Sequence, residues 1–121
     1  MGYTMRNGKY ADTLEINLAP IEGVLTQDGN SAVVEVGSKR VLNLHLLIDS
    51  VSTDDTLDVT IQTSFDGVTW YSAGTFTQAT DAGGDPLDQR KDFVVNRFVR
   101  ADFNVGGSSV SIPCTLRGEA A

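Results

Sequence analysis

Residues 57–70, LDVTIQTSFDGVTW, alternate apolar and polar side chains without interruption until the chain reaches Asp66-Gly67. The odd-numbered residues from Leu57 to Phe65 share one face of an extended chain, and the even-numbered residues share the other. This period of two predicts a strand with one dry and one wet face, as in an antiparallel sheet. Because Asp-Gly is a turn sequence, we expect a hairpin about Asp66-Gly67, with residues 68–78 as its second strand.

The rest of the chain repeats this pattern in short segments separated by turn residues. These segments are 14–18, 32–36, 41–51, 93–105 and 109–118. We find no window in which apolar residues recur at helical spacing. The pattern therefore predicts an all-β fold, an antiparallel β-sandwich of seven to eight strands with jelly-roll or Greek-key connections. We expect residues 13–121 to form a single domain and residues 1–12, which show neither period, to form an N-terminal arm.

Glycines, a proline and one continuous apolar run give more specific expectations. Gly74 lies inside a predicted strand and indicates a bulge or a close approach by another backbone. Gly106-Gly107 predicts a tight hairpin between the last two strands. Pro113 cannot donate to a ladder, so the last strand is expected at a sheet edge. Segment 41–51 is the most apolar and is expected to be central, with both faces covered around Leu47.

The charge balance limits the classes of partner. The chain has 121 residues, with nine Lys and Arg against sixteen Asp and Glu, and a formal net charge of −7. Such a chain repels nucleic acid and anionic membranes. No apolar stretch is long enough to span a membrane, and the first residues lack the apolar core of a secretion signal, so we expect synthesis in the cytoplasm. The sequence cluster Arg90, Lys91, Arg97 and Arg100 is interrupted by Asp88, Asp92 and Asp102, which favours cross-strand charge pairs over a basic patch.

Candidate catalytic residues are few. Cys114 is the only cysteine and is in phase with the apolar face of its segment, so we expect a buried thiol that behaves as a small hydrophobe. The only histidine, His45, lies about seventy residues earlier on another predicted strand, which leaves the thiol without an expected base. Most of the twelve aspartates lie in turns, where they close the backbone. We therefore predict that the protein is not an enzyme.

The longest predicted loop, Ala79–Gln89, is the candidate metal site. It carries Asp81, Asp85 and Asp88, whose oxygens are suitable calcium ligands. Their spacing lacks the alternation and the terminal Glu of a known calcium loop, so we favour an ordinary acidic surface loop. One His and one Cys cannot form a tetrahedral zinc set. We expect no metal and no cofactor.

Aromatic residues are the candidate partner contacts. Trp70 shares its phase with Val68 and Phe76 and is expected in the core. Tyr71 faces the other way and is expected to be exposed, where it either anchors a partner or covers a cross-strand neighbour. The arm is read either as a tail without structure or as a docking segment, because it concentrates large side chains in a short polar stretch. The candidate contacts in the arm are Tyr3, Met5, Arg6 and Tyr10.

Two segments together resemble a known class of protein. SFDGVTW, residues 64–70, and RFVRADFNVGGSSVS, residues 97–111, resemble small all-β structural proteins encoded among the head and tail genes of tailed bacteriophages. The resemblance covers roughly the C-terminal half of the chain. It implies a virion component, and a capsid decoration or cement protein suits a small acidic β domain with an arm. A tail or head-tail connector component is the alternative within this class.

The same segments also resemble the discoidin, or coagulation-factor type C, modules. Their hairpin reads S-x-D-G-x-x-W and a later strand reads A-R-Y-V-R, which Ser64, Asp66, Gly67 and Trp70 and the run Arg97–Arg100 match, with Phe98 in place of the tyrosine. The chain is shorter than such modules and lacks their terminal cysteine pair. This resemblance implies a module that binds carbohydrate or lipid through a loop end.

From the phage resemblance we expect a protein that binds the major capsid protein on the outside of the head and stabilises the shell. It implies a homo-oligomer, with a trimer favoured because such proteins often occupy local threefold positions. The expected location is the capsid surface of the virion, after synthesis in the host cytoplasm.

Overall fold

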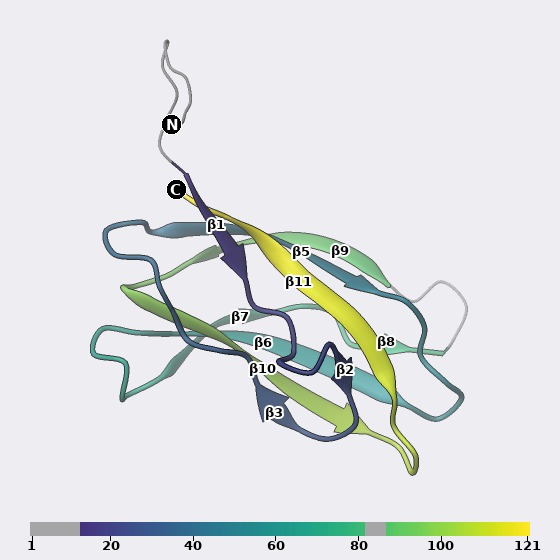
Figure 1. Cartoon of the computed structure of the whole chain (residues 1–121). Helices are drawn as coiled ribbons and strands as arrows, with labels where there is room; N and C mark the ends of the chain where they lie inside the picture. Colours follow the sequence, from purple (N-terminus) through teal and green to yellow (C-terminus); the bar gives the residue numbers. More distant parts are fainter. Residues whose placement is uncertain (1–12, 82–86) are drawn as a thin grey trace.

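The computed structural model (Figure 1) describes residues 13–81 and 87–121, and every regular element in these ranges is a β-strand. The all-β class predicted from the sequence is confirmed. The longer strands are β1 (Leu14–Asn17), β5 (Val41–Ile48), β6 (Thr56–Ser64), β7 (Tyr71–Thr75), β9 (Asp88–Val94), β10 (Phe98–Gly106) and β11 (Ile112–Ala120). Four short strands of two residues each add edge pairs: β2 (Val24–Leu25), β3 (Gly29–Asn30), β4 (Val34–Glu35) and β8 (Ala79–Thr80).

The strands form two antiparallel sheets that pack face to face as a β-sandwich (Figure 1). The first sheet has the order β1-β11-β5-β9, and β2 pairs with β11. The second has the order β3-β10-β6-β7, while β4 pairs with β10 and β8 pairs with β6. β5 lies between β11 and β9, so the predicted central position of segment 41–51 is confirmed.

One hydrophobic core fills the space between the sheets, and it follows from the alternation in the sequence. In β5 the even-numbered residues from Leu42 to Ile48 are buried, and in β6 the odd-numbered residues from Leu57 to Thr63 are buried. β10 contributes Val99, Ala101 and Phe103 to the same cluster. Full burial of each large aliphatic side chain contributes about 1.5–3 kcal/mol, so this shared core stabilises the sandwich.

Residues 93–105, predicted as one strand, belong to two sheets. β9 ends in the first sheet and β10 begins in the second, and the link between them is held where Val36 N donates to Arg97 O at 2.7 Å. Phe93, Val95 and Val99 are all buried in the same core. Because the apolar phase stays odd through the crossing, the alternation alone carries no sign of it.

Two expectations about the C-terminal strands are wrong. β10 and β11 lie in different sheets, so Gly106-Gly107 starts a crossover between sheets and not a tight hairpin. β11 is an inner strand, with β5 on one side and β1 and β2 on the other. Pro113 is tolerated because it is the second residue of β11 and lies beside the two-residue β2. Its carbonyl still accepts a hydrogen bond from Asp49 N at 3.1 Å.

The predicted bulge at Gly74 is confirmed. The register between β6 and β7 shifts between Ile61 and Gln62, so Ile61 lies opposite Gly74 and Gln62 lies opposite Ser72. Gly74 has a φ of +146°, and a Cβ there would lie 3.1 Å from the Phe93 ring, so the close neighbour is a side chain rather than a backbone. The two-sided cover predicted near Leu47 is wrong, because that outward-facing side chain is 41% exposed.

Candidate functional site

The turn between β6 and β7 is held by side-chain to backbone hydrogen bonds. The buried Ser64 Oγ accepts from Asp66 N at 3.2 Å and from Gly67 N at 2.9 Å. Asp66 Oδ1 accepts from Ser64 Oγ at 3.0 Å, from Val68 N at 2.8 Å and from Thr69 N at 2.9 Å. Gly67 has a φ of +79°, which glycine adopts without strain. The amides of Thr69 and Val68 and the Ser64 hydroxyl favour the carboxylate and hold the pKa of Asp66 below its ordinary value.

This turn presents large apolar side chains to solvent. Phe65 is 69% exposed, Val68 is 80% exposed and Tyr71 is 57% exposed. We call residues 65–71 the hairpin tip. A single exposed apolar residue is ordinary, whereas here three lie within seven residues, next to a turn that five hydrogen bonds fix.

Sequence reasoning identified Tyr71 as exposed, which is confirmed, but missed the other two side chains. Phe65 was expected on the dry face because the alternation runs through it. β6 ends at Ser64, where the turn takes over, so Phe65 lies outside the sandwich. The pattern Ser64-x-Asp66-Gly67 was the available signal, since Ser and Asp side chains that bond nearby amides end strands.

Trp70 lies outside the core, contrary to expectation. The bulge at Gly74 inserts one residue into β7, which places Ser72 and Trp70 on the outer face of the second sheet. Phe76, on the other side of the bulge, is buried. Trp70 is half-buried there, with the Arg100 guanidinium 4.2 Å from its ring centroid. Arg100 Nε also donates to Gln62 Oε1 at 2.7 Å. The ring and the guanidinium thus brace the hairpin against β10 through a cation–π contact.

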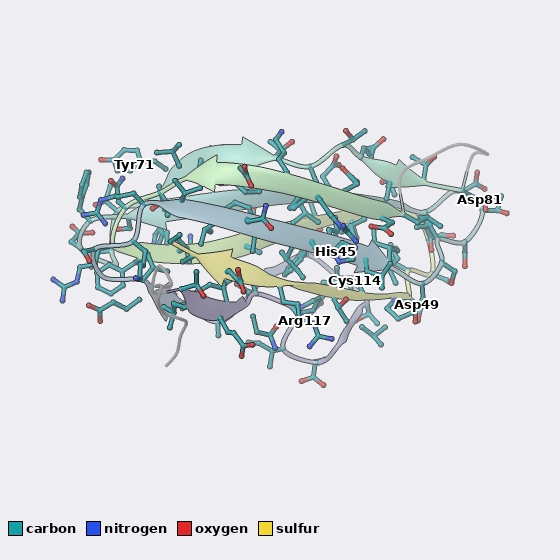
Figure 2. All side chains as sticks on the ribbon, turned by 90° about the horizontal axis from the view of Figure 1, so that it is seen from above. His45, Asp49, Tyr71, Asp81, Cys114 and Arg117 are labelled. Carbon is teal, nitrogen blue, oxygen red and sulfur yellow. The ribbon has the colours of Figure 1, made fainter. Side chains whose placement is uncertain are left out.

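Cys114 and His45 do not form a catalytic pair. Cys114 faces the core opposite Ile48, as predicted, and burial raises the pKa of its thiol to about 11. His45 lies on β5 in the outward-facing phase, where its Nε2 is 2.6 Å from Asp88 Oδ1. Figure 2 shows both side chains from above. A protonated thiol on the opposite face of the sheet from the imidazole cannot be activated by it.

The basic residues that cluster in sequence are divided between two sheets, with Arg90 and Lys91 on β9, Arg100 on β10 and Arg97 just before β10. Arg97 forms an ion pair with Glu35 of β4, with Nη2 and Oε2 2.7 Å apart. Lys91 Nζ donates to Thr75 O at 2.7 Å, across the edge where β9 of one sheet meets β7 of the other. With Arg100 engaged by Trp70, these side chains serve as contacts between strands and sheets.

Two aspartates, Asp49 and Asp81, lie at the end of the sandwich opposite Tyr71 (Figure 2). Residues 41–89, which supply β5, β6, β7, β8 and the links between them, contain no Lys or Arg. Asp81 accepts from Thr53 Oγ1 at 3.2 Å. The end that carries Asp49 and Asp81 is thus opposite the end that carries Tyr71.

Part of the predicted acidic loop lies outside the described residues. Ala79–Thr80 pairs with β6, and β9 begins at Asp88, so the unpaired stretch is shorter than expected. Asp85 is not described, and Asp88 is engaged by His45. Among residues 13–81 and 87–121, no group of three or more His, Cys, Asp or Glu side chains could hold a metal ion.

The predicted arm contacts Tyr3, Met5, Arg6 and Tyr10 also lie outside the described residues. In the part of the chain that the structure covers, no helix is long and apolar enough to cross a membrane. The described residues form a small β-sandwich that carries an apolar hairpin tip held by hydrogen bonds. No family model matches the chain, and no curated protein matches its sequence.

Proposed function

We propose that this chain is a structural protein of a phage virion, a capsid decoration or cement protein that docks on the major capsid protein through its hairpin tip. The observation that carries the proposal is the fixed turn that exposes Phe65, Val68 and Tyr71. A surface that is already ordered loses little conformational entropy when it binds, so a small apolar contact can provide useful affinity. The resemblance of residues 64–70 and 97–111 to phage head and tail proteins supports this class.

The positions of Asp49 and Asp81 opposite Tyr71 support an orientation on the shell. The hairpin tip faces the capsid, and the acidic end at Asp49 and Asp81 faces solvent, where carboxylates keep neighbouring particles apart. Copies arranged as trimers at the local threefold positions of the shell would each contribute one tip. Several weak contacts made together then hold the oligomer far more tightly than one contact holds a monomer.

Co-sedimentation with purified head shells of the phage that encodes the chain tests the proposal. We expect the wild-type chain to pellet with shells and to saturate at a fixed ratio to the capsid protein. The variant Phe65→Ser with Val68→Ser should remain folded, because both side chains lie outside the core, and should lose most binding. Val33→Ser is the matched control, since Val33 is 50% exposed but does not belong to the tip. Equal binding by the tip variant would reject the proposed surface.

The tail or connector alternative uses the same tip with a different partner. Repeating the co-sedimentation assay with purified tail tubes in place of head shells distinguishes the two proposals. A decoration protein should pellet with shells only, and a tail component with tail tubes only. A glycan array with and without calcium tests the discoidin-like reading. A specific sugar signal that survives the Phe65→Ser, Val68→Ser changes would favour that reading over a virion role.

A further inference from the structure

Within the described strands of the second sheet, Arg100 is the only Lys or Arg. Its guanidinium carbon lies 4.2 Å from the centroid of the Trp70 ring, and its Nε donates to Gln62 Oε1 at 2.7 Å. Gln62 of β6 is in register with Arg100, and Trp70 belongs to the hairpin tip. All three side chains are half-buried. The guanidinium is therefore held in one orientation beside the tip, by a ring on one face and an amide on one edge.

No carboxylate among the described residues forms an ion pair with this guanidinium. Each acidic side chain on the strands of the same sheet has another partner: Glu35 pairs with Arg97, Asp58 accepts from Gln78, and Asp102 accepts from Asn30 and Asn104. The Nη1 and Nη2 atoms of Arg100 have no hydrogen-bond acceptor within the described ranges. They are the remaining donors of the side chain, so an oriented positive charge with an unused edge is available to a second molecule.

We propose that Arg100 binds a carboxylate of the protein on which the hairpin tip docks. This inference rests on the proposed function and specifies the chemistry of the partner, an aspartate or glutamate beside an apolar surface. The unused edge of a guanidinium can bond both oxygens of one carboxylate, and stacking on Trp70 orients that edge in advance. Phe65, Val68 and Tyr71 supply the apolar part of the same contact. Arginine combined with aromatic side chains is typical of the residues that dominate binding energy at interfaces.

A single carboxylate suits this site better than a chain of phosphates. The whole chain has a formal net charge of −7, which repels a nucleic acid. Asp58 and Asp102 lie on the strands of the same sheet and would repel the phosphates that follow the first one. One aspartate or glutamate needs only the one fork that Arg100 offers.

Blocking the carboxylates of purified head shells tests the contact. Shell carboxylates are converted to amides with a carbodiimide and glycinamide, and binding of the full chain is measured by co-sedimentation. The wild-type chain should bind blocked shells about tenfold more weakly than untreated shells. Arg100→Gln should bind untreated shells about tenfold more weakly than the wild type does. Blocking should weaken the binding of Arg100→Gln by less than about twofold, because the variant no longer uses the carboxylate.

Two further variants separate the fork from the charge. Arg97→Gln is the matched control, because it makes the same change in net charge close to the tip while Arg97 is already paired with Glu35. Its expected loss is below about threefold. Arg100→Lys keeps the charge but replaces the planar fork by a point charge, so it should lose more than about threefold. Circular dichroism establishes that each variant is folded before its binding is interpreted.

The inference is overturned if Arg100→Gln binds untreated shells as well as the wild type, or if blocking weakens both chains equally. A loss in Arg97→Gln equal to that in Arg100→Gln would reflect net charge alone and would also overturn it, as would wild-type binding by Arg100→Lys. If the wild-type chain still pellets with shells while the Phe65→Ser, Val68→Ser variant does not, these results reject the Arg100 contact and leave the proposed function intact. A wild-type chain that does not pellet with shells would overturn both.

Discussion

Replacing Ser64 by alanine tests whether side-chain hydrogen bonds hold the hairpin tip. The Ser64 side chain is fully buried, and its Oγ accepts from two amides and donates to the Asp66 carboxylate. Alanine leaves the amides of Asp66 and Gly67 without this acceptor. An unsatisfied group costs about 1–3 kcal/mol, and water can reach this turn, so we expect a total loss of about 2 kcal/mol.

Urea unfolding followed by the fluorescence of Trp70, the only tryptophan, measures this loss. A domain of 121 residues unfolds with an entropy of about 0.25 kcal/mol/K, so 2 kcal/mol corresponds to a fall of about 8 °C in Tm. Ser109→Ala is the control, because Ser109 is exposed and lies in the link before β11. A Ser64→Ala loss below about 0.5 kcal/mol, no larger than an ordinary surface change, would refute the reasoning.

Three further predictions follow from individual contacts. The pKa of Asp66 is lower in the folded chain than its ordinary value of 3.8, so the ionised carboxylate stabilises the fold at any pH above 3.8. This contribution is lost as the pH falls through the lowered pKa of the folded state. The stability difference between wild type and Asp66→Ala should therefore shrink in acid, while Asp66→Asn, which keeps an acceptor, should lose less at neutral pH. Gly74→Ala should cost about 1–3 kcal/mol in urea unfolding, because its Cβ would press on the Phe93 ring, whereas Gly29→Ala, with open space around it, should be near neutral. Cys114, with its pKa raised to about 11, should resist iodoacetamide at pH 8 until the chain is unfolded, as mass spectrometry would show; rapid labelling of the native chain would contradict its burial.

The period of two in the sequence was sufficient to predict the class of fold. It located the buried faces of β5, β6 and β10, because each strand has one face on the shared core. It could not locate the crossing between β9 and β10, since Phe93, Val95 and Val99 keep one phase while they pass from sheet to sheet. Neighbour relations between strands depend on contacts between distant residues, which is why Pro113 was assigned to an edge.

The candidate site was only partly predictable for a local reason. A single bulged residue reverses the phase of every residue before it, so Trp70 moved from the predicted core to the outer face. Tyr71 was predicted correctly because it lies at the strand end, where exposure depends little on phase. Phe65 was missed because the turn begins at Ser64, and Val68 was missed because the turn continues through Thr69, so both residues lie outside the strands.

The stability of the head shell itself gives the most direct test of the proposed role. Purified shells would be heated with saturating wild-type chain, with the Phe65→Ser, Val68→Ser variant, or with no addition, and the temperature of shell disruption would be recorded by light scattering. We expect the wild-type chain to raise this temperature and the tip variant to leave it unchanged. An equal rise with the tip variant, or no rise with the wild type, would contradict docking through the hairpin tip.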